Sequence, residues 1–103
     1  APYPSSKYAV GARVFPTLVP IHPSNPARQA NERAWEMYKA WTKPFITLFS
    51  TRDPVTKGGE KMWQKRVPGA AGQQHTQIRG AGHFVQEDKG EEVAQALVAF
   101  VRA

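Results

Sequence analysis

Apolar residues along this chain gather in short clusters that prolines and glycines separate. One cluster, residues 45–49 (Phe-Ile-Thr-Leu-Phe), is nearly continuous and lacks a period of two, which is typical of a strand covered on both faces in a parallel sheet. We predict a second strand at about His75–Arg79. A helix at about Glu60–Val67 separates the strands, and a final helix covers about Glu91–Arg102. This β-α-β-α order predicts neighbouring parallel strands with a right-handed crossover.

A longer amphipathic helix is predicted before the first strand, from Asn25 to about Thr42. Asn25 is a favourable N-cap residue, and the proline after it suits the first helical position, where its missing N–H costs nothing. Lys43-Pro44 ends the helix. We expect its apolar face to pack in the core rather than bind a ligand. That face consists of Ala30, Ala34, Met37, Tyr38 and Trp41, and the matching face of the final helix of Val93, Ala94, Leu97, Val98 and Val101.

Residues 1–26 form a proline-rich segment in which long regular structure is not expected. A short helical turn at Tyr8–Val14 is predicted, and the rest is predicted to be an irregular connection. A disordered tail is the alternative, which the many apolar side chains of the segment disfavour. Six of the nine prolines lie here: Pro2, Pro4, Pro16, Pro20, Pro23 and Pro26.

Length and composition fit one modest globular domain, with 103 residues of which 41% are hydrophobic. A formal charge of +6 suggests nucleic-acid binding, but the basic residues are scattered singly or in pairs, so we expect no nucleic-acid partner. No apolar run approaches the roughly 18 residues of a membrane span, and we expect a cytoplasmic protein without a membrane partner. The chain has no cysteine, and its histidines lack the local spacing of a zinc site, so no metal is predicted.

Asp53 and His83 are the candidate catalytic residues. Each lies in the loop that leaves a predicted strand, and functional loops of open parallel sheets lie beyond the carboxyl ends of the strands. Neighbouring strands are about 4.8 Å apart, so the two side chains can meet. The carboxylate would then fix the tautomer of the imidazole and stabilise its protonated form. By themselves, Asp53-Pro54 is a common turn pair and a lone histidine is usually a polar loop residue.

The loop around the histidine supports this interpretation. Gly80 and Gly82 tolerate positive φ and close backbone contact, which allows a tight exit from the strand. Phe84 and Val85 would screen the imidazole from solvent. The order of acid then histidine, late in the chain, is that of α/β-hydrolases.

Three segments resemble haloalkane dehalogenases, in the correct order over almost the whole chain. Residues 80–87 (GAGHFVQE) are similar to that family's histidine motif, and residues 45–56 (FITLFSTRDPVT) to the strand and acid loop of the subgroup whose acid follows the penultimate strand. Residues 11–20 (GARVFPTLVP) resemble the end of the cap domain. Gly-His-Phe alone is weak, because epoxide hydrolases and esterases share it, and the cap-exit segment discriminates.

The resemblance implies an α/β fold, namely the C-terminal part of an α/β-hydrolase with two parallel strands and flanking helices, preceded by the end of a cap domain. Residues 1–24 would be the cap exit and residues 25–103 part of the hydrolase core. The resemblance implies an enzyme that hydrolyses carbon–halogen bonds in small apolar haloalkanes through an alkyl-aspartate ester, without a cofactor. His83 would activate water and Asp53 would orient it. Pro16, Val19, Val55 and Phe84 would line the apolar substrate pocket.

The nucleophile and the first oxyanion-hole segment of that family have no counterpart here. Trp35, Trp41 and Trp63 match helix positions and are not expected to bind halide. Asp88 is predicted to cap the last helix rather than to replace the nucleophile. We therefore expect the isolated chain to be inactive and to need the upstream part of the same protein to complete its sheet.

Two alternatives stay open from the sequence. One is another hydrolase of the same fold, either an epoxide hydrolase or a serine esterase. The other is a non-enzymatic product, such as a truncated reading frame or a protein that needs a partner chain. The substrate range and the oligomeric state do not follow from these residues.

Overall fold

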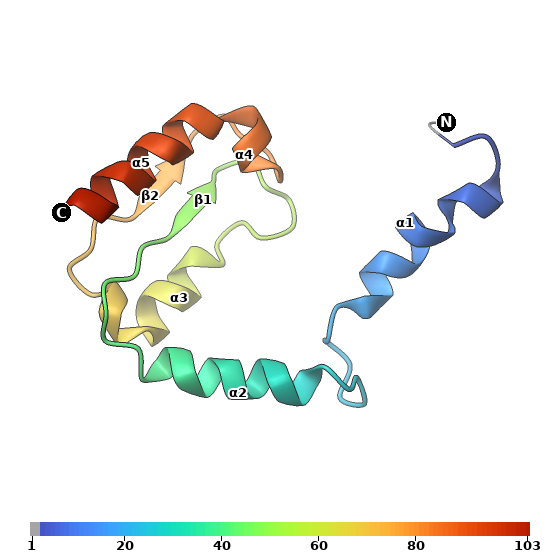
Figure 1. Ribbon diagram of the computed structural model, residues 1–103, viewed down its shortest axis with the longest axis horizontal. Coiled ribbons are helices and arrows are strands. Elements are labelled where there is room, and N and C mark those ends of the chain that lie inside the picture. The colour runs from blue at the N-terminus through green and yellow to red at the C-terminus, as the bar shows by residue number, and fades with distance from the viewer. Residues whose placement is uncertain (1–2) are drawn as a thin grey trace. The chain divides into compact units, whose positions relative to one another are not determined.

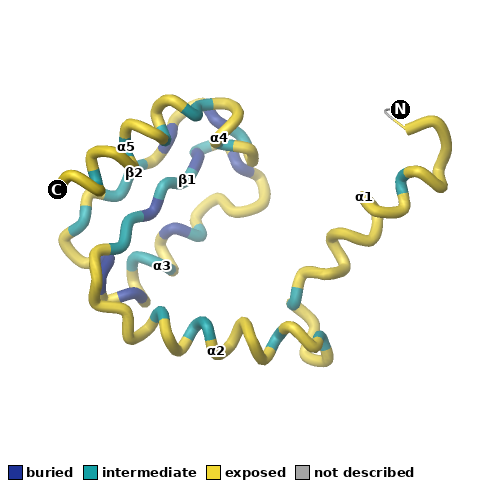
Figure 2. Tube along the Cα trace, viewed as in Figure 1, coloured by how far each residue is buried: buried dark blue, intermediate teal, exposed yellow. Residues whose placement is uncertain are grey.

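The computed structural model describes residues 3–103 (Figure 1). The chain forms two compact units, one that ends at Glu36 and one that comprises Met37–Ala103. The first unit holds three short helical segments in succession: η1 (Ser6–Ala9), α1 (Val10–Val14) and η2 (Phe15–Leu18). The predicted turn at Tyr8–Val14 is therefore present and extends in both directions. None of the described residues up to Glu36 is buried (Figure 2). Residues 1 and 2 of the predicted cap-exit segment lie outside the described residues.

Helix α2 (Arg28–Lys39) begins three residues after the predicted cap residue, Asn25. The side-chain oxygen of Asn25 accepts a hydrogen bond from the Ala27 N–H at 2.9 Å, which satisfies one of the free donors of the first turn. The helix ends three residues before the predicted Thr42. Its expected core face is not buried within this chain, since Met37 is 70% exposed and no α2 residue is buried.

Tyr38 of that helix is half-buried and joins an aromatic cluster. Its ring makes edge contacts with Phe45 and Trp63, at centroid distances of 6.2 and 5.2 Å. Phe45 and Trp63 stack on each other at 5.8 Å. This cluster connects the end of α2 to the segment that leads into the first strand.

Strands β1 (Leu48–Ser50) and β2 (Thr76–Ile78) form a parallel two-stranded sheet in which Leu48 is opposite Thr76 and Ser50 is opposite Ile78. The predicted parallel pairing is confirmed. Both strands are shorter than predicted. The first strand begins later than predicted, because the apolar residues 45–47 precede the ladder. At the carboxyl ends of the strands, two backbone hydrogen bonds extend the pairing, from Thr51 N–H to the Ile78 carbonyl at 3.1 Å and from Arg52 N–H to the Ala81 carbonyl at 3.2 Å.

Helices α3 (Glu60–Arg66) and α5 (Gly90–Arg102) cover opposite faces of the sheet (Figure 1). The side chain of Gln77 donates to Glu60 of α3 at 3.2 Å, whereas its neighbour Thr76 lies in a cleft whose other wall is α5. Successive strand residues point to opposite faces, so the two helices must lie on different sides. The prediction of a sheet with flanking helices is confirmed.

The last helix differs from the prediction in the face that it presents to the sheet. Val93, Ala96 and Phe100 are its half-buried apolar residues, whereas Leu97 is 45% and Val101 81% exposed. A one-turn helix, α4 (Val85–Asp88), precedes α5 and was not predicted. No helix of the described residues is long and apolar enough to cross a membrane.

Among residues 3–103, all of the buried residues lie between Thr47 and Ala81 (Figure 2). Four of them form the apolar core, namely Val67, Ala70, Ile78 and Ala81. The short helical turn η3 (Pro68–Ala70) lies beside the segment after α2, where Gly69 donates to the Trp41 carbonyl at 2.8 Å and accepts from Phe45 N–H at 3.0 Å. A Cβ on Gly69 would lie 1.9 Å from the Lys43 carbonyl oxygen. Only glycine permits this contact between backbones.

Gly69→Ala should therefore lower the free energy of unfolding of a full-length protein containing this chain, by about 1–3 kcal/mol, as expected for forced overpacking. Gly90→Ala is the matched control, because nothing lies within 4 Å of a Cβ there and alanine favours a helix. Urea unfolding measures both. Equal midpoints for the two variants would contradict the close contact at Gly69.

Candidate active site

Asp53 is a buried carboxylate, 5% exposed, in the loop that leaves β1. Its Oδ1 accepts hydrogen bonds from the Val55 N–H at 2.7 Å and from His83 Nδ1 at 3.0 Å. Its Oδ2 accepts a hydrogen bond from the Thr56 hydroxyl. Both oxygens are therefore engaged by donors, and a carboxylate that accepts several hydrogen bonds is stabilised in its charged form.

These donors hold the pKa of Asp53 well below its usual range. The hydrogen bond from the Thr56 hydroxyl contributes most to the lowering, while burial of the carboxylate opposes it. The backbone of residues 55 and 56 and the His83 side chain lower the pKa further. Asp53 is therefore an anion at neutral pH and can only accept hydrogen bonds.

His83 follows β2 by five residues and faces Asp53 with one ring nitrogen. Because the carboxylate is only an acceptor, His83 Nδ1 carries the proton of this hydrogen bond. In the neutral ring, Nε2 then keeps its lone pair, and it makes no hydrogen bond to any residue in the range 3–103. The side chain is 44% exposed. This geometry can present a base to water or to a ligand.

The loop that carries His83 is held at Gly82, the residue before it. The Ser50 hydroxyl at the end of β1 donates to the Gly82 carbonyl at 2.7 Å, and the Gly82 N–H donates to Asp88 Oδ2 at 2.6 Å. Gly80 has the predicted positive φ, +81°, which turns the chain out of β2. Gly82 does not have a positive φ. The absence of a side chain there instead permits the close approach of the Asp88 carboxylate.

The prediction that Asp88 caps the last helix is wrong. Asp88 is the last residue of α4, and Lys89 occupies the cap position of α5 without a side-chain cap. The Asp88 carboxylate instead binds the loop at Gly82. The sequence interpretation also missed Ser50 and Thr56; an Asp-x-x-Thr spacing, which suits a side-chain bond within a turn, is the signal that points to Thr56.

The other two histidines are arranged differently. The Thr47 N–H donates to His75 Nδ1 at 3.1 Å, and His75 Nε2 lies 3.0 Å from the Ala70 carbonyl, which requires Nε2 to carry the proton. His75 is thus engaged at both nitrogens by backbone groups. His22 lies in a local turn with Ser24. Among the three, His83 combines a carboxylate partner with a ring nitrogen available for chemistry.

The four predicted pocket residues lie in different surroundings. The Phe84 ring meets the His83 ring edge-on at a centroid distance of 5.1 Å and is 58% exposed. Val55 is 72% exposed and contributes its N–H to Asp53. Pro16 lies in η2 and Val19 directly after it, both in the first unit. Their part in lining a substrate pocket stays a prediction.

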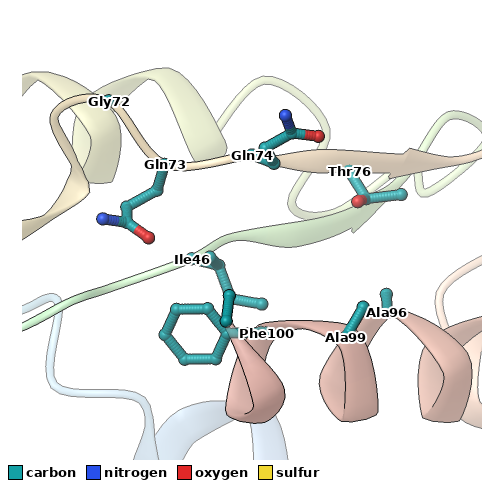
Figure 3. A pocket seen from close by; sticks show the side chains of 9 residues that line it. Ile46, Gly72, Gln73, Gln74, Thr76, Ala96, Ala99 and Phe100 are labelled. Atoms are coloured by element: carbon teal, nitrogen blue, oxygen red, sulfur yellow. The ribbon is translucent and has the colours of Figure 1, made fainter.

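A cleft among the described residues lies away from this pair. It has a volume of about 460 Å³ and lies at the amino ends of the strands, where the side chains of Ile46, Phe100, Ala96 and Ala99 approach one another (Figure 3). Asp53 and His83 follow the carboxyl ends, and neither lines the cleft. Within residues 3–103 no group of three or more His, Cys, Asp or Glu residues could hold a metal ion.

Comparison with known proteins relates this chain to one class of enzyme. A haloalkane dehalogenase of Psychrobacter cryohalolentis is 55% identical over 101 residues, which is 98% of this chain and 33% of that protein. Haloalkane dehalogenases of Mycolicibacterium paratuberculosis and Mycobacterium marinum are each 46% identical, over 100% and 97% of the chain. The chain spans about a third of the length of these relatives. No protein-family profile matches it.

The lowered pKa of Asp53 predicts how stability depends on pH. An unfolded aspartate takes up its proton near pH 3.9, whereas folded Asp53 resists protonation, so its contribution is complete above about pH 4 and is lost as the pH falls towards its folded pKa. Asp53→Asn should give a full-length protein whose stability falls less steeply below about pH 4. The midpoint of urea unfolding, determined for both proteins over a range of pH, measures this dependence. Parallel curves for the two proteins would contradict the assignment.

Proposed function

The chain is a homologue of the haloalkane dehalogenases and spans about a third of their length, and we propose that it supplies the base histidine and the acid partner of such an enzyme. The observation that carries the proposal is the contact between His83 Nδ1 and buried Asp53 at the carboxyl edge of the sheet. The named relatives favour dehalogenation over epoxide or ester hydrolysis. The substrate would be a small apolar haloalkane.

In this proposal, the bond between carbon and halogen is broken by a residue outside this chain. An aspartate carboxylate displaces halide from carbon and forms an alkyl ester. His83 Nε2 then removes a proton from a water molecule, which attacks the carbonyl carbon of the ester. The ester collapses to an alcohol and a free carboxylate. Because a carboxylate is already ionised at neutral pH, the nucleophile needs no base, and the histidine acts as the base for water.

Asp53 would act on this step through the imidazole. It holds the Nδ1–H tautomer that leaves Nε2 basic, and its negative charge stabilises the imidazolium that forms when water loses a proton. Its hydrogen-bond donors keep it charged throughout. After hydrolysis the imidazolium releases its proton to solvent, which the exposure of His83 permits.

We also propose how the chain is divided and completed. Residues 1–24 would be the exit from a cap domain, and residues 25–103 part of the hydrolase core, with Pro16, Val19, Val55 and Phe84 lining the substrate pocket. Support for a missing remainder comes from the exposed apolar side chains of α2 and α5 and from a sheet of only two strands among the described residues. Upstream strands of the same protein would complete that sheet.

The isolated 103-residue chain should therefore release no halide from a small bromoalkane, because it lacks a nucleophile. Halide release over hours at micromolar protein is the measurement. Turnover by the isolated chain that disappears in its His83→Ala variant would overturn the proposal.

In a full-length protein containing this chain, His83→Ala should release about one halide per enzyme and then stop, because the ester forms but is not hydrolysed. Rapid mixing with quantification of halide measures the burst, and mass spectrometry measures the retained alkyl group. His22→Ala is the control, since His22 lies in a local turn, and it should turn over like the parent. Steady turnover by His83→Ala would exclude the assigned role.

A further inference from the structure

We infer that Thr56 is a positioning residue for ester hydrolysis, because its hydroxyl fixes the rotation of the Asp53 carboxylate and thereby directs one oxygen at His83. The inference rests on the proposed function and adds Thr56 to the residues that serve it. The hydrogen bond of the Thr56 side chain goes to Asp53 and not to His83. Its effect passes through Asp53.

The two oxygens of Asp53 have different partners, which defines the orientation of the carboxylate. Oδ1 receives the Val55 N–H and His83 Nδ1, and Oδ2 receives the Thr56 hydroxyl. The two bonds to Oδ1 already restrict rotation of the carboxyl group about its Cβ–Cγ bond. The bond at Oδ2 restrains the other oxygen as well, so the carboxylate is held from both sides while Oδ1 is directed at the imidazole.

Backbone groups of residues 55 and 56 also bind the Asp53 carboxylate, but the Thr56 hydroxyl is the side-chain donor that this loop supplies to it. Between residues 52 and 58, Asp53 is the only buried residue, and Val55 is largely exposed. Thr56 is also tied to the start of α3, because its carbonyl accepts the Gly59 N–H at 2.9 Å, directly before that helix begins. Thr56 thus connects the acid loop to a helix packed on the sheet. The large contribution of its hydroxyl to the lowered pKa of Asp53 agrees with a direct bond.

The expected defect is confined to one step of the reaction. If the Asp53 carboxylate rotates, His83 loses its fixed tautomer and orientation, and a displaced base slows attack of water on the ester. Formation of the ester needs neither Asp53 nor His83, so release of the first halide should be unchanged. A residue that only stabilised the fold would lower both steps in proportion to the folded protein that remains.

The test compares Thr56→Val and Thr56→Ser in a full-length protein containing this chain, with a small bromoalkane as the probe. Valine keeps the shape and removes the hydroxyl, whereas serine keeps the hydroxyl. Thr56→Val should show a full halide burst of one per enzyme followed by steady turnover that is slower by about 10-fold or more, the order of effect of a misplaced catalytic group. Thr56→Ser should restore most of the steady rate.

The outcomes separate this inference from the proposed function. Parent-like steady turnover by Thr56→Val, or a burst and a steady rate reduced by the same factor, would overturn the role of Thr56 while leaving His83 and Asp53 untouched. Equal defects in Thr56→Val and Thr56→Ser would also overturn it, because the hydroxyl would then be irrelevant. A parent protein that releases no halide at all would instead contradict the proposed function.

Discussion

The parallel pairing of β1 with β2 is the constraint on which the rest of the site depends. Because both strands run in the same direction, their exit loops meet at one edge of the sheet, and residues 30 positions apart come within 3.0 Å. The bonds from Thr51 and Arg52 to the exit of β2 continue the pairing into those loops. Short loop segments after the two strands are then enough to bring Asp53 and His83 together. An antiparallel arrangement would place them at opposite ends.

Polar contacts define this edge more than apolar packing does. The apolar core consists of four small or medium side chains, whereas Gly82 is held at both its carbonyl and its N–H, and Asp53 at both its oxygens. Hydrogen bonds to charged groups are stronger and more directional than those between neutral groups. They can therefore fix the geometry of the pair in a segment whose helices still expose apolar faces. The site is well defined locally even though the sheet has only two strands.

Much of this could be predicted from the sequence, and the failures have identifiable causes. Helices α3 and α5 lie within one residue of their predicted bounds, whereas α2 is three residues shorter at each end than predicted. The juxtaposition of Asp53 and His83 followed from chain order in a parallel sheet. Helix α4 was missed because a single turn carries no periodicity. The face of α5 was misassigned because the helix is apolar on two sides. The tertiary bonds of Ser50 and Asp88 to Gly82 leave no pattern along the chain, so only the structure reveals them.

The central claim is that His83 carries its proton on Nδ1 towards Asp53 and keeps Nε2 free as a base. Nitrogen-15 NMR of a full-length protein with labelled histidine measures this directly, with His83→Ala to assign its signals. The account predicts a protonated Nδ1 and an unprotonated Nε2 for His83, and the opposite tautomer for His75. A His83 ring protonated on Nε2 alone would contradict it.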